Sequence, residues 1–154
     1  MAWTARSYSL MSSRWSGAVL LLLVASSYLG VVQAGFVWDD GALVLLNEQT
    51  RSFANIGQVF SGDLWAGVDE SSGYYRPLMM LSLMVDEYFW GHDDALGHHL
   101  HSLFWHLAAT GMLWVLLRRE LGTEWAWPIG AVFGLHAAQS EAVFWVSARN
   151  DSMS

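Results

Sequence analysis

The chain has 154 residues and a net charge of −7, with 54% apolar and only 14% charged residues. A typical soluble domain has about 25% charged residues, so this composition argues against a soluble globular protein. All seven basic residues are arginines, and they are scattered along an acidic chain, so we do not expect nucleic acid as a partner. The chain has no cysteine, so we do not expect a thiolate metal site.

The first predicted element is a membrane span over residues 16–37. Residues 1–15 form a short polar terminus with Arg6 and Arg14, and the next 22 residues carry no charge, enough to cross about 30 Å of hydrocarbon. A cleaved signal peptide is the alternative, because Val32-Gln33-Ala34 resembles a cleavage site. We favour a retained anchor, since further apolar segments follow.

Residues 38–99 form a predicted external loop. From residue 35 to residue 97 the sequence holds ten acidic residues and only two arginines, and clusters of Ser, Gly and Asp mark turns. Within it, the apolar run 77–90 begins with proline, which suits the first turn of a helix. Because 14 residues are too few to cross a bilayer, we predict a helix at the interface or against the bundle.

Two more apolar runs predict a second span over 100–117 and a shorter third span over 126–138. Basic residues favour the cytoplasmic side, so the N-terminus and the loop 118–125 are predicted to be cytoplasmic. The acidic loop is then external, and residues 139–154 begin a second external loop. The expected fold is an all-α integral membrane bundle, and we expect the chain to be a truncated part of a longer protein.

Ten tryptophans are many for a chain of this length. Five bracket the first and last apolar runs, as expected of a side chain that favours the headgroup zone: Trp15, Trp38, Trp125, Trp127 and Trp145. Trp65 and Trp90 are better candidates for stacking on a sugar ring.

Two adjacent carboxylates, Asp39 and Asp40, follow the first span. Mutual repulsion near a low-dielectric boundary raises a carboxyl pKa toward that of a general base, or prepares the pair to hold a divalent metal ion. The alternative is a solvated acidic end that only positions the span. Spacing alone leaves both interpretations open.

Other candidate residues are scattered along the chain. Arg76, beside Tyr75, is suited to bidentate capture of phosphate, although it could simply neutralise the acidic loop. Glu141 and His136 end the third apolar run, and Glu141 would need a partner such as His136 or Arg149. An ionisable residue at membrane depth is a hypothesis of function by default.

Histidines crowd the start of the second span. On a helix, His99, Ser102 and His106 form one stripe, for which we expect hydrogen bonding between helices. Zinc would need a further ligand and a defined geometry, so no metal ligand is assigned. A metal-dependent membrane hydrolase built on His98, His101 and this stripe is an alternative hypothesis.

The order of these motifs resembles the N-terminal region of the transmembrane-and-TPR O-mannosyltransferases and their bacterial relatives. The resemblance covers roughly residues 17–154 and rests on Phe36-Val37-Trp38-Asp39-Asp40, Tyr75-Arg76-Pro77-Leu78, the stripe of His99, Ser102 and His106, and Phe133 to His136 through Glu141-Ala142-Val143 and Arg149. The family has asparagine at the position of Ser102, and serine can still bond across helices. The family has proline where this chain has Ala137. Without that proline the end of the helix, and with it the placement of Glu141, is less defined.

The resemblance implies the N-terminal part of a multi-spanning GT-C glycosyltransferase. Its donor would be mannose or a similar sugar linked to polyprenyl or dolichyl phosphate, and its acceptor a hydroxyl on a polypeptide or glycan. Asp39 or Asp40 would be the general base and Glu141 would orient a partner or the acceptor. Arg76 or Arg149 would meet the leaving phosphate, and Tyr75 and His136 are assigned to substrate binding.

The same resemblance implies a multi-pass protein of the bacterial inner membrane or the endoplasmic reticulum, in contact with membrane lipid. Family members continue through further spans and TPR repeats, so this chain alone is expected to be inactive. The alternative is a non-catalytic membrane protein or assembly subunit, which would tolerate substitution of Asp39, Asp40 and Glu141.

Overall fold

A computed structural model describes residues 15–153, and between these ends helices and turns occur without any strand, which confirms the all-α prediction. Arg6 and Arg14 lie outside the described residues. The α-helices are α1 (Ser16–Ser27), α2 (Ile56–Ser61), α3 (Pro77–Trp90), α4 (Ala95–Leu121), α5 (Thr123–Leu135), α6 (Gln139–Phe144) and α7 (Asn150–Met153). Short 3₁₀ helices cover Leu29–Gln33, Glu48–Arg51, Phe53–Asn55, Ala66–Val68 and Val146–Ala148, and a π-helical turn covers Gly41–Leu45.

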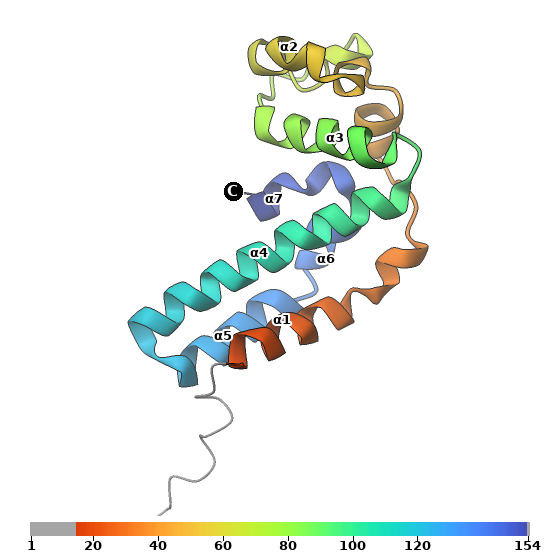
Figure 1. The fold of residues 1–154 in the computed structure, drawn as a ribbon. Coiled ribbons are helices and arrows are strands. Elements are labelled where there is room, and N and C mark those ends of the chain that lie inside the picture. The colour runs from red at the N-terminus through yellow and green to blue at the C-terminus, as the bar shows by residue number, and fades with distance from the viewer. Residues whose placement is uncertain (1–14, 154) are drawn as a thin grey trace, which may run out of the picture.

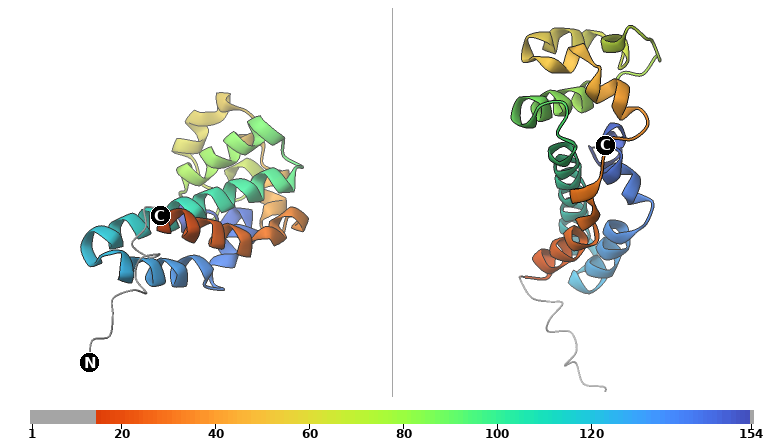
Figure 2. Two further views of the ribbon diagram at one scale, coloured as in Figure 1. Left: turned by 60° about the horizontal axis from the view of Figure 1, so that its bottom comes forward. Right: turned by 90° about the vertical axis from the view of Figure 1, so that its right-hand side faces the viewer.

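The helices form two connected parts. Helices α1, α4 and α5 pack against one another as a bundle (Figure 1). Residues 41–90, here called the cap, lie at the end of the bundle where α4 begins, with α3 next to α4 and α2 beyond it (Figure 2). The chain then returns through α6 and α7, which pack against α4 between the bundle and the cap.

Helix α4 begins at Ala95, five residues before the predicted second span, because Asp94 caps it. The Asp94 carboxylate accepts hydrogen bonds from the backbone N–H groups of Leu96 and Gly97, at 3.1 and 3.4 Å. At the other end, Gly122 has a φ of 83°, a conformation that glycine adopts readily, and the chain turns there into α5.

Two apolar cores hold the molecule together. The core of the bundle joins residues of α1, α4 and α5 with Val143 of α6. The core of the cap joins residues of the π-helical turn, α2 and α3 with Val146. Val143 and Val146 are three residues apart, so residues 143–150, here called the returning segment, tie the bundle to the cap.

Two helical stretches, Ser16–Gln33 and Ala95–Leu121, are long and apolar enough to cross a membrane. Only 33% of the residues of the first stretch, and 28% of the apolar 18-residue window of the second, are buried inside the protein. Large apolar side chains of the bundle are instead exposed on its surface, with exposed fractions of 70% at Leu22, 66% at Met112 and 68% at Val132. This surface is typical of a protein that contacts lipid or further helices.

The close approach of α3 and α4 gives a first prediction, that Gly97→Ala destabilises the protein. A Cβ atom at position 97 would lie 2.4 Å from Cγ and 2.8 Å from Cβ of Trp90, and the Trp90 Cβ cannot move without shifting the end of α3. We expect a loss of about 1–3 kcal/mol, measured as a lower melting temperature in detergent.

Gly111→Ala, on the same helix, is the matched control. Its Cβ would meet only the side chain of Leu21 at 3.8 Å, and alanine favours a helix by about 1 kcal/mol. Equal melting temperatures for the two variants would contradict the predicted clash at Trp90.

Candidate active site

A cavity of about 390 Å³ opens where the exit of α1, the cap and the returning segment meet. Its walls combine carboxylates, one arginine and several aromatic rings. The lining residues are Asp39, Leu43, Leu64, Trp65, Ser72, Tyr74, Arg76, Trp145, Ser147, Ala148, Asn150 and Asp151. Acid, cation and aromatic surface in one cavity is a typical lining of a small polar substrate site.

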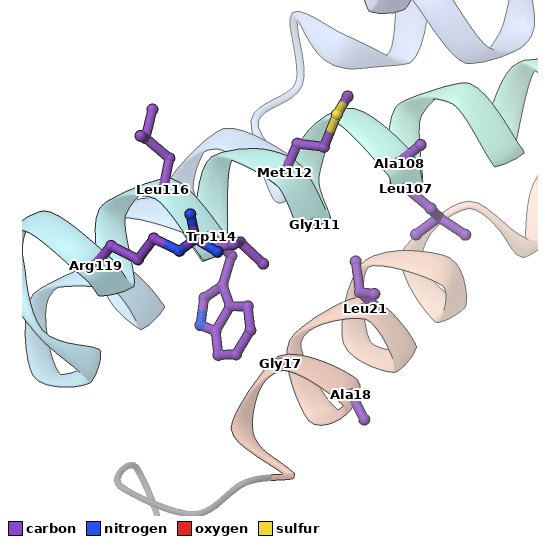
Figure 3. Close-up of a pocket in the computed structure, with 11 residues that line it drawn as sticks. Gly17, Ala18, Leu21, Leu107, Ala108, Gly111, Met112, Trp114, Leu116 and Arg119 are labelled. Carbon is purple, nitrogen blue, oxygen red and sulfur yellow. The ribbon is translucent and has the colours of Figure 1, made fainter.

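A second cavity, of about 690 Å³, lies between α1 and α4 and differs in chemistry (Figure 3). Leu21, Met112 and Trp114 lie around it together with small residues, and Arg119 at its end is the ionisable side chain of its lining. It offers no carboxylate for acid–base chemistry, so the smaller, polar cavity is the candidate active site.

The two adjacent aspartates have different surroundings. Asp40 is fully buried, and its carboxylate accepts four hydrogen bonds. The backbone N–H and hydroxyl of Ser147 donate to Oδ1 at 2.8 and 2.7 Å, and the N–H groups of Val37 and Val146 donate to Oδ2 at 3.1 and 3.3 Å. Asp39 is half-buried and lines the cavity. Of the two carboxylates, only Asp39 is therefore available to a substrate.

A left-handed backbone turn at Trp38 precedes the two aspartates. Its φ is 48°, a conformation that costs a residue other than glycine about 1–2 kcal/mol. The Trp38 ring meets the Trp145 ring edge to face, with centroids 5.1 Å apart. The contact with Trp145 and the bond from Val37 to Asp40 hold this turn on both sides.

Arg76 brings the positive charge into the cavity. Its Nη1 donates to Oδ1 of Asn150 at 2.9 Å, and its guanidinium lies 5.2 Å from the centre of the Tyr74 ring. Arg76 directly precedes Pro77, the first residue of α3, so the rigid start of that helix fixes its backbone.

A tight loop presents the aromatic wall of the cavity. The carboxylate of Asp63 accepts hydrogen bonds from the N–H groups of Trp65, Ser72 and Gly73 and from the Ser72 hydroxyl. The hydrogen bond from Trp65 contributes most to lowering the pKa of Asp63, and the bonds from Ser72 and Gly73 lower it further. Together these bonds fold the loop back on itself. Trp65, Ser72 and Tyr74 thereby reach the same cavity.

The other predicted site residues lie elsewhere. Glu141 and His136 are exposed near α6, where Nδ1 of His136 accepts a hydrogen bond from the N–H of Ala138. The hydroxyl of Tyr75 donates to the carbonyl of Phe60 at 3.0 Å. Arg149 is fully buried beside Asp86, a partner that sequence reasoning missed. Burial lowers the pKa of the Arg149 guanidinium, and Asp86 opposes this shift.

The histidines and Ser102 of α4 connect distant segments. The ring nitrogens of His99 lie 3.1 and 3.2 Å from the carbonyl oxygens of Val143 and Gly35, and Nε2 of His106 lies 3.0 Å from that of Gly134. The Ser102 hydroxyl accepts a hydrogen bond from Arg149. The stripe therefore joins α4 to α5, α6 and the exit of α1.

A metal ion does not fit the aspartate pair, because four hydrogen bonds already occupy the Asp40 carboxylate. Within residues 15–153, no three histidine or acidic side chains gather in a manner that would hold a metal. Both the metal-assisted version of the aspartate site and the hydrolase built on histidines therefore lack a ligand set among the described residues.

Known proteins resemble this chain over most of its length. It is 33% identical to protein O-mannosyl-transferase Tmtc1 and 34% identical to Tmtc2, both of Drosophila melanogaster, each over 128 residues and 80% of the chain. Mouse protein O-mannosyl-transferase TMTC3 is 24% identical over 139 residues, or 88% of the chain. The curated homologues are TMTC-family protein O-mannosyltransferases. The resemblance predicted from the motifs is thus confirmed.

The chain spans only about 15% of the length of these TMTC relatives. No protein-family model matches it, and no solved structure does. The names of these three relatives describe them as protein O-mannosyl-transferases.

Proposed function

We propose that this chain forms the part of a membrane O-mannosyltransferase that carries its general base. The full protein would transfer mannose or a similar sugar from polyprenyl or dolichyl phosphate to a serine or threonine hydroxyl of a protein. The observation that carries the proposal is the single cavity shared by Asp39, Arg76 and three aromatic rings, those of Trp65, Tyr74 and Trp145.

In this proposal Asp39 accepts the proton of the acceptor hydroxyl while the hydroxyl oxygen attacks the anomeric carbon of the sugar. The bond between that carbon and the phosphate oxygen breaks, and its electron pair leaves with the lipid phosphate. Arg76 stabilises the negative charge on the departing phosphate. Attack from the face opposite the phosphate inverts the anomeric configuration.

The proposed topology follows the GT-C architecture. The stretches Ser16–Gln33 and Ala95–Leu121 cross the membrane, with Arg118 and Arg119 on the cytoplasmic side. The cap and its cavity then lie on the external or lumenal side, and α3 lies at the interface. Exposed apolar rings at the end of α3, those of Tyr88, Phe89 and Trp90, suit the headgroup zone. The membrane would be the bacterial inner membrane or the endoplasmic reticulum.

The test is a transfer assay on the full-length protein in membranes, with mannosyl-phosphoryl-dolichol or its polyprenyl analogue as donor and a serine- and threonine-containing peptide as acceptor. Arg76→Gln removes the cation from the cavity. We expect transfer to fall roughly 100-fold, since one lost donor to a developing anion costs about that much.

Arg51→Gln is the matched control, because Arg51 is the other arginine of the cap and pairs with Glu87 at 3.5 Å, outside the cavity. Its transfer rate should stay within about twofold of the parent, as expected for a partly exposed ion pair. Full activity of Arg76→Gln would refute the phosphate contact. Absence of transfer by the parent protein with either donor would refute the proposed function itself.

A further inference from the structure

A buried ion pair lies beside the cavity and is not part of the proposed reaction. Arg149 of the returning segment and Asp86 of α3 are both fully buried, and Nη1 of Arg149 lies 2.6 Å from Oδ2 of Asp86. Isolated buried charges are costly, so each of these groups needs the other to remain charged inside the protein.

The Arg149 guanidinium is also held by neutral partners on α3 and α4. Its Nη1 donates to the Ser82 hydroxyl at 3.1 Å, its Nε to the Ser102 hydroxyl at 3.0 Å, and its Nη2 to the carbonyl of His98 at 2.7 Å. Together with Asp86, these contacts occupy all three nitrogens of the guanidinium. The side chain is therefore bound within the protein and is not turned toward a substrate.

The second oxygen of Asp86 is held by His101 of α4, whose Nδ1 bonds to Oδ1 of Asp86. The indole N–H of Trp105 donates to Nε2 of the same ring at 3.0 Å. Because Nε2 accepts that bond, Nδ1 carries the proton and donates it to Asp86. The pair thus spans α3, α4 and the returning segment.

The neighbours of Arg149 in the returning segment hold the proposed catalytic groups. Ser147, two residues earlier, donates two hydrogen bonds to Asp40, the residue next to Asp39. Asn150, the next residue, accepts the bond from Arg76. Ser147 and Asn150 both line the cavity, whereas Arg149 does not. One short segment therefore fixes both sides of the cavity and is itself anchored by Arg149.

We infer that Arg149 is a positioning residue, which through its ion pair with Asp86 holds Ser147 and Asn150 where they set the base Asp39 and the phosphate ligand Arg76. This inference rests on the proposed transferase function, and it replaces the expectation that Arg149 itself meets the phosphate. If the pair only positions the segment, replacing both Arg149 and Asp86 by apolar side chains should preserve activity, because the segment then stays in place. Loss of one partner alone leaves the other charge buried and unpaired.

The experiment compares Arg149→Met, Asp86→Leu and the double variant in the full-length protein. Each single variant should lose at least about tenfold in transfer, since it strands a buried charge. The double variant should regain most of that loss, to within about threefold of the parent, because apolar pairs often replace buried ion pairs without cost. A direct phosphate ligand could not be rescued in this way.

A second readout does not depend on transfer. These 154 residues contain no cysteine, so Asn150→Cys introduces one thiol here, in a full-length protein whose cysteines elsewhere are replaced by serine. The rate at which a maleimide labels this thiol in membranes reports how firmly the segment is held. Labelling should be faster in the presence of Arg149→Met or Asp86→Leu and return to the parent rate in the double variant. Ser140→Cys, an exposed position on α6 outside the segment, should label at one rate throughout.

The outcomes distinguish a positioning role of Arg149 from direct contact between Arg149 and the substrate. A double variant as inactive as Arg149→Met, with Asn150→Cys labelling at the parent rate, would show that Arg149 touches substrate and would overturn the inference. Labelling that is unchanged in both single variants would also overturn it. If the parent transfers no sugar, the proposed function fails while the labelling rates still show whether the pair seats the segment.

Discussion

Asparagine in place of Asp39 is expected to lower sugar transfer by at least about 100-fold while leaving the fold intact. A general base contributes about 10²–10⁴-fold, and the asparagine amide cannot accept the acceptor's proton. The backbone carbonyl of residue 39, which asparagine retains, accepts hydrogen bonds from the N–H groups of Ala42 and Leu43, where the next helical turn begins. The half-buried carboxylate faces the cavity, so the amide can occupy the same place.

The measurement is mannose transfer to the peptide by full-length protein, normalised to the amount inserted in the membrane. Asp69→Asn is the matched control, because Asp69 is an exposed aspartate of the cap outside the cavity. Its φ is 58°, and asparagine tolerates such a left-handed conformation. Unchanged transfer in Asp39→Asn would exclude Asp39 as the base and assign proton removal to another group.

The apolar helices were predictable because their causes are local, whereas the short helices α2, α6 and α7 lie in segments predicted as loops. Uncharged or apolar runs, Pro77 at the start of α3 and charged residues after the second run all lie close in sequence to the elements they determine. Helix α4 begins five residues before the predicted span 100–117, because Asp94 caps the helix at that point. Asp94 and Gly97 lie on a stretch that reads as polar loop by composition alone.

The site depended on contacts that no local pattern contains. Arg149 was expected to bind phosphate, yet it is buried against Asp86, which lies 63 positions earlier in the chain. The sequence did contain a clue: Asp86 is one of two acidic residues in the apolar run of α3, and an acid that is buried when the helix packs needs a cationic partner. Glu141 and His136 share their motif with the family but lie exposed near α6, away from the cavity.

The choice between the adjacent aspartates could not be made from the sequence either. The two have the same side chain and the same local composition. They differ because the chain turns left-handed at Trp38 and because Val146 and Ser147, more than 100 residues away, donate to Asp40 alone. Long-range packing therefore decides which carboxylate is buried and which faces the cavity.

Asp40→Asn, unlike Asp39→Asn, should therefore cause a large loss of stability. The carboxylate accepts four hydrogen bonds inside the protein, and the amide nitrogen of asparagine would turn a donor toward N–H groups that are themselves donors. Unsatisfied buried donors cost about 1–3 kcal/mol each, so we expect a loss of roughly 2–5 kcal/mol.

The measurement is the melting temperature of the purified protein in detergent, compared between Asp39→Asn and Asp40→Asn. The two substitutions make the same chemical change at neighbouring positions, so charge, expression and handling are matched. A lower melting temperature for Asp40→Asn alone, with lost transfer in both variants, assigns Asp39 to the chemistry and Asp40 to its support. A stable but inactive Asp40→Asn protein beside an active Asp39→Asn protein would reverse the assignment, because the buried carboxylate would then have to open toward the substrate during the reaction.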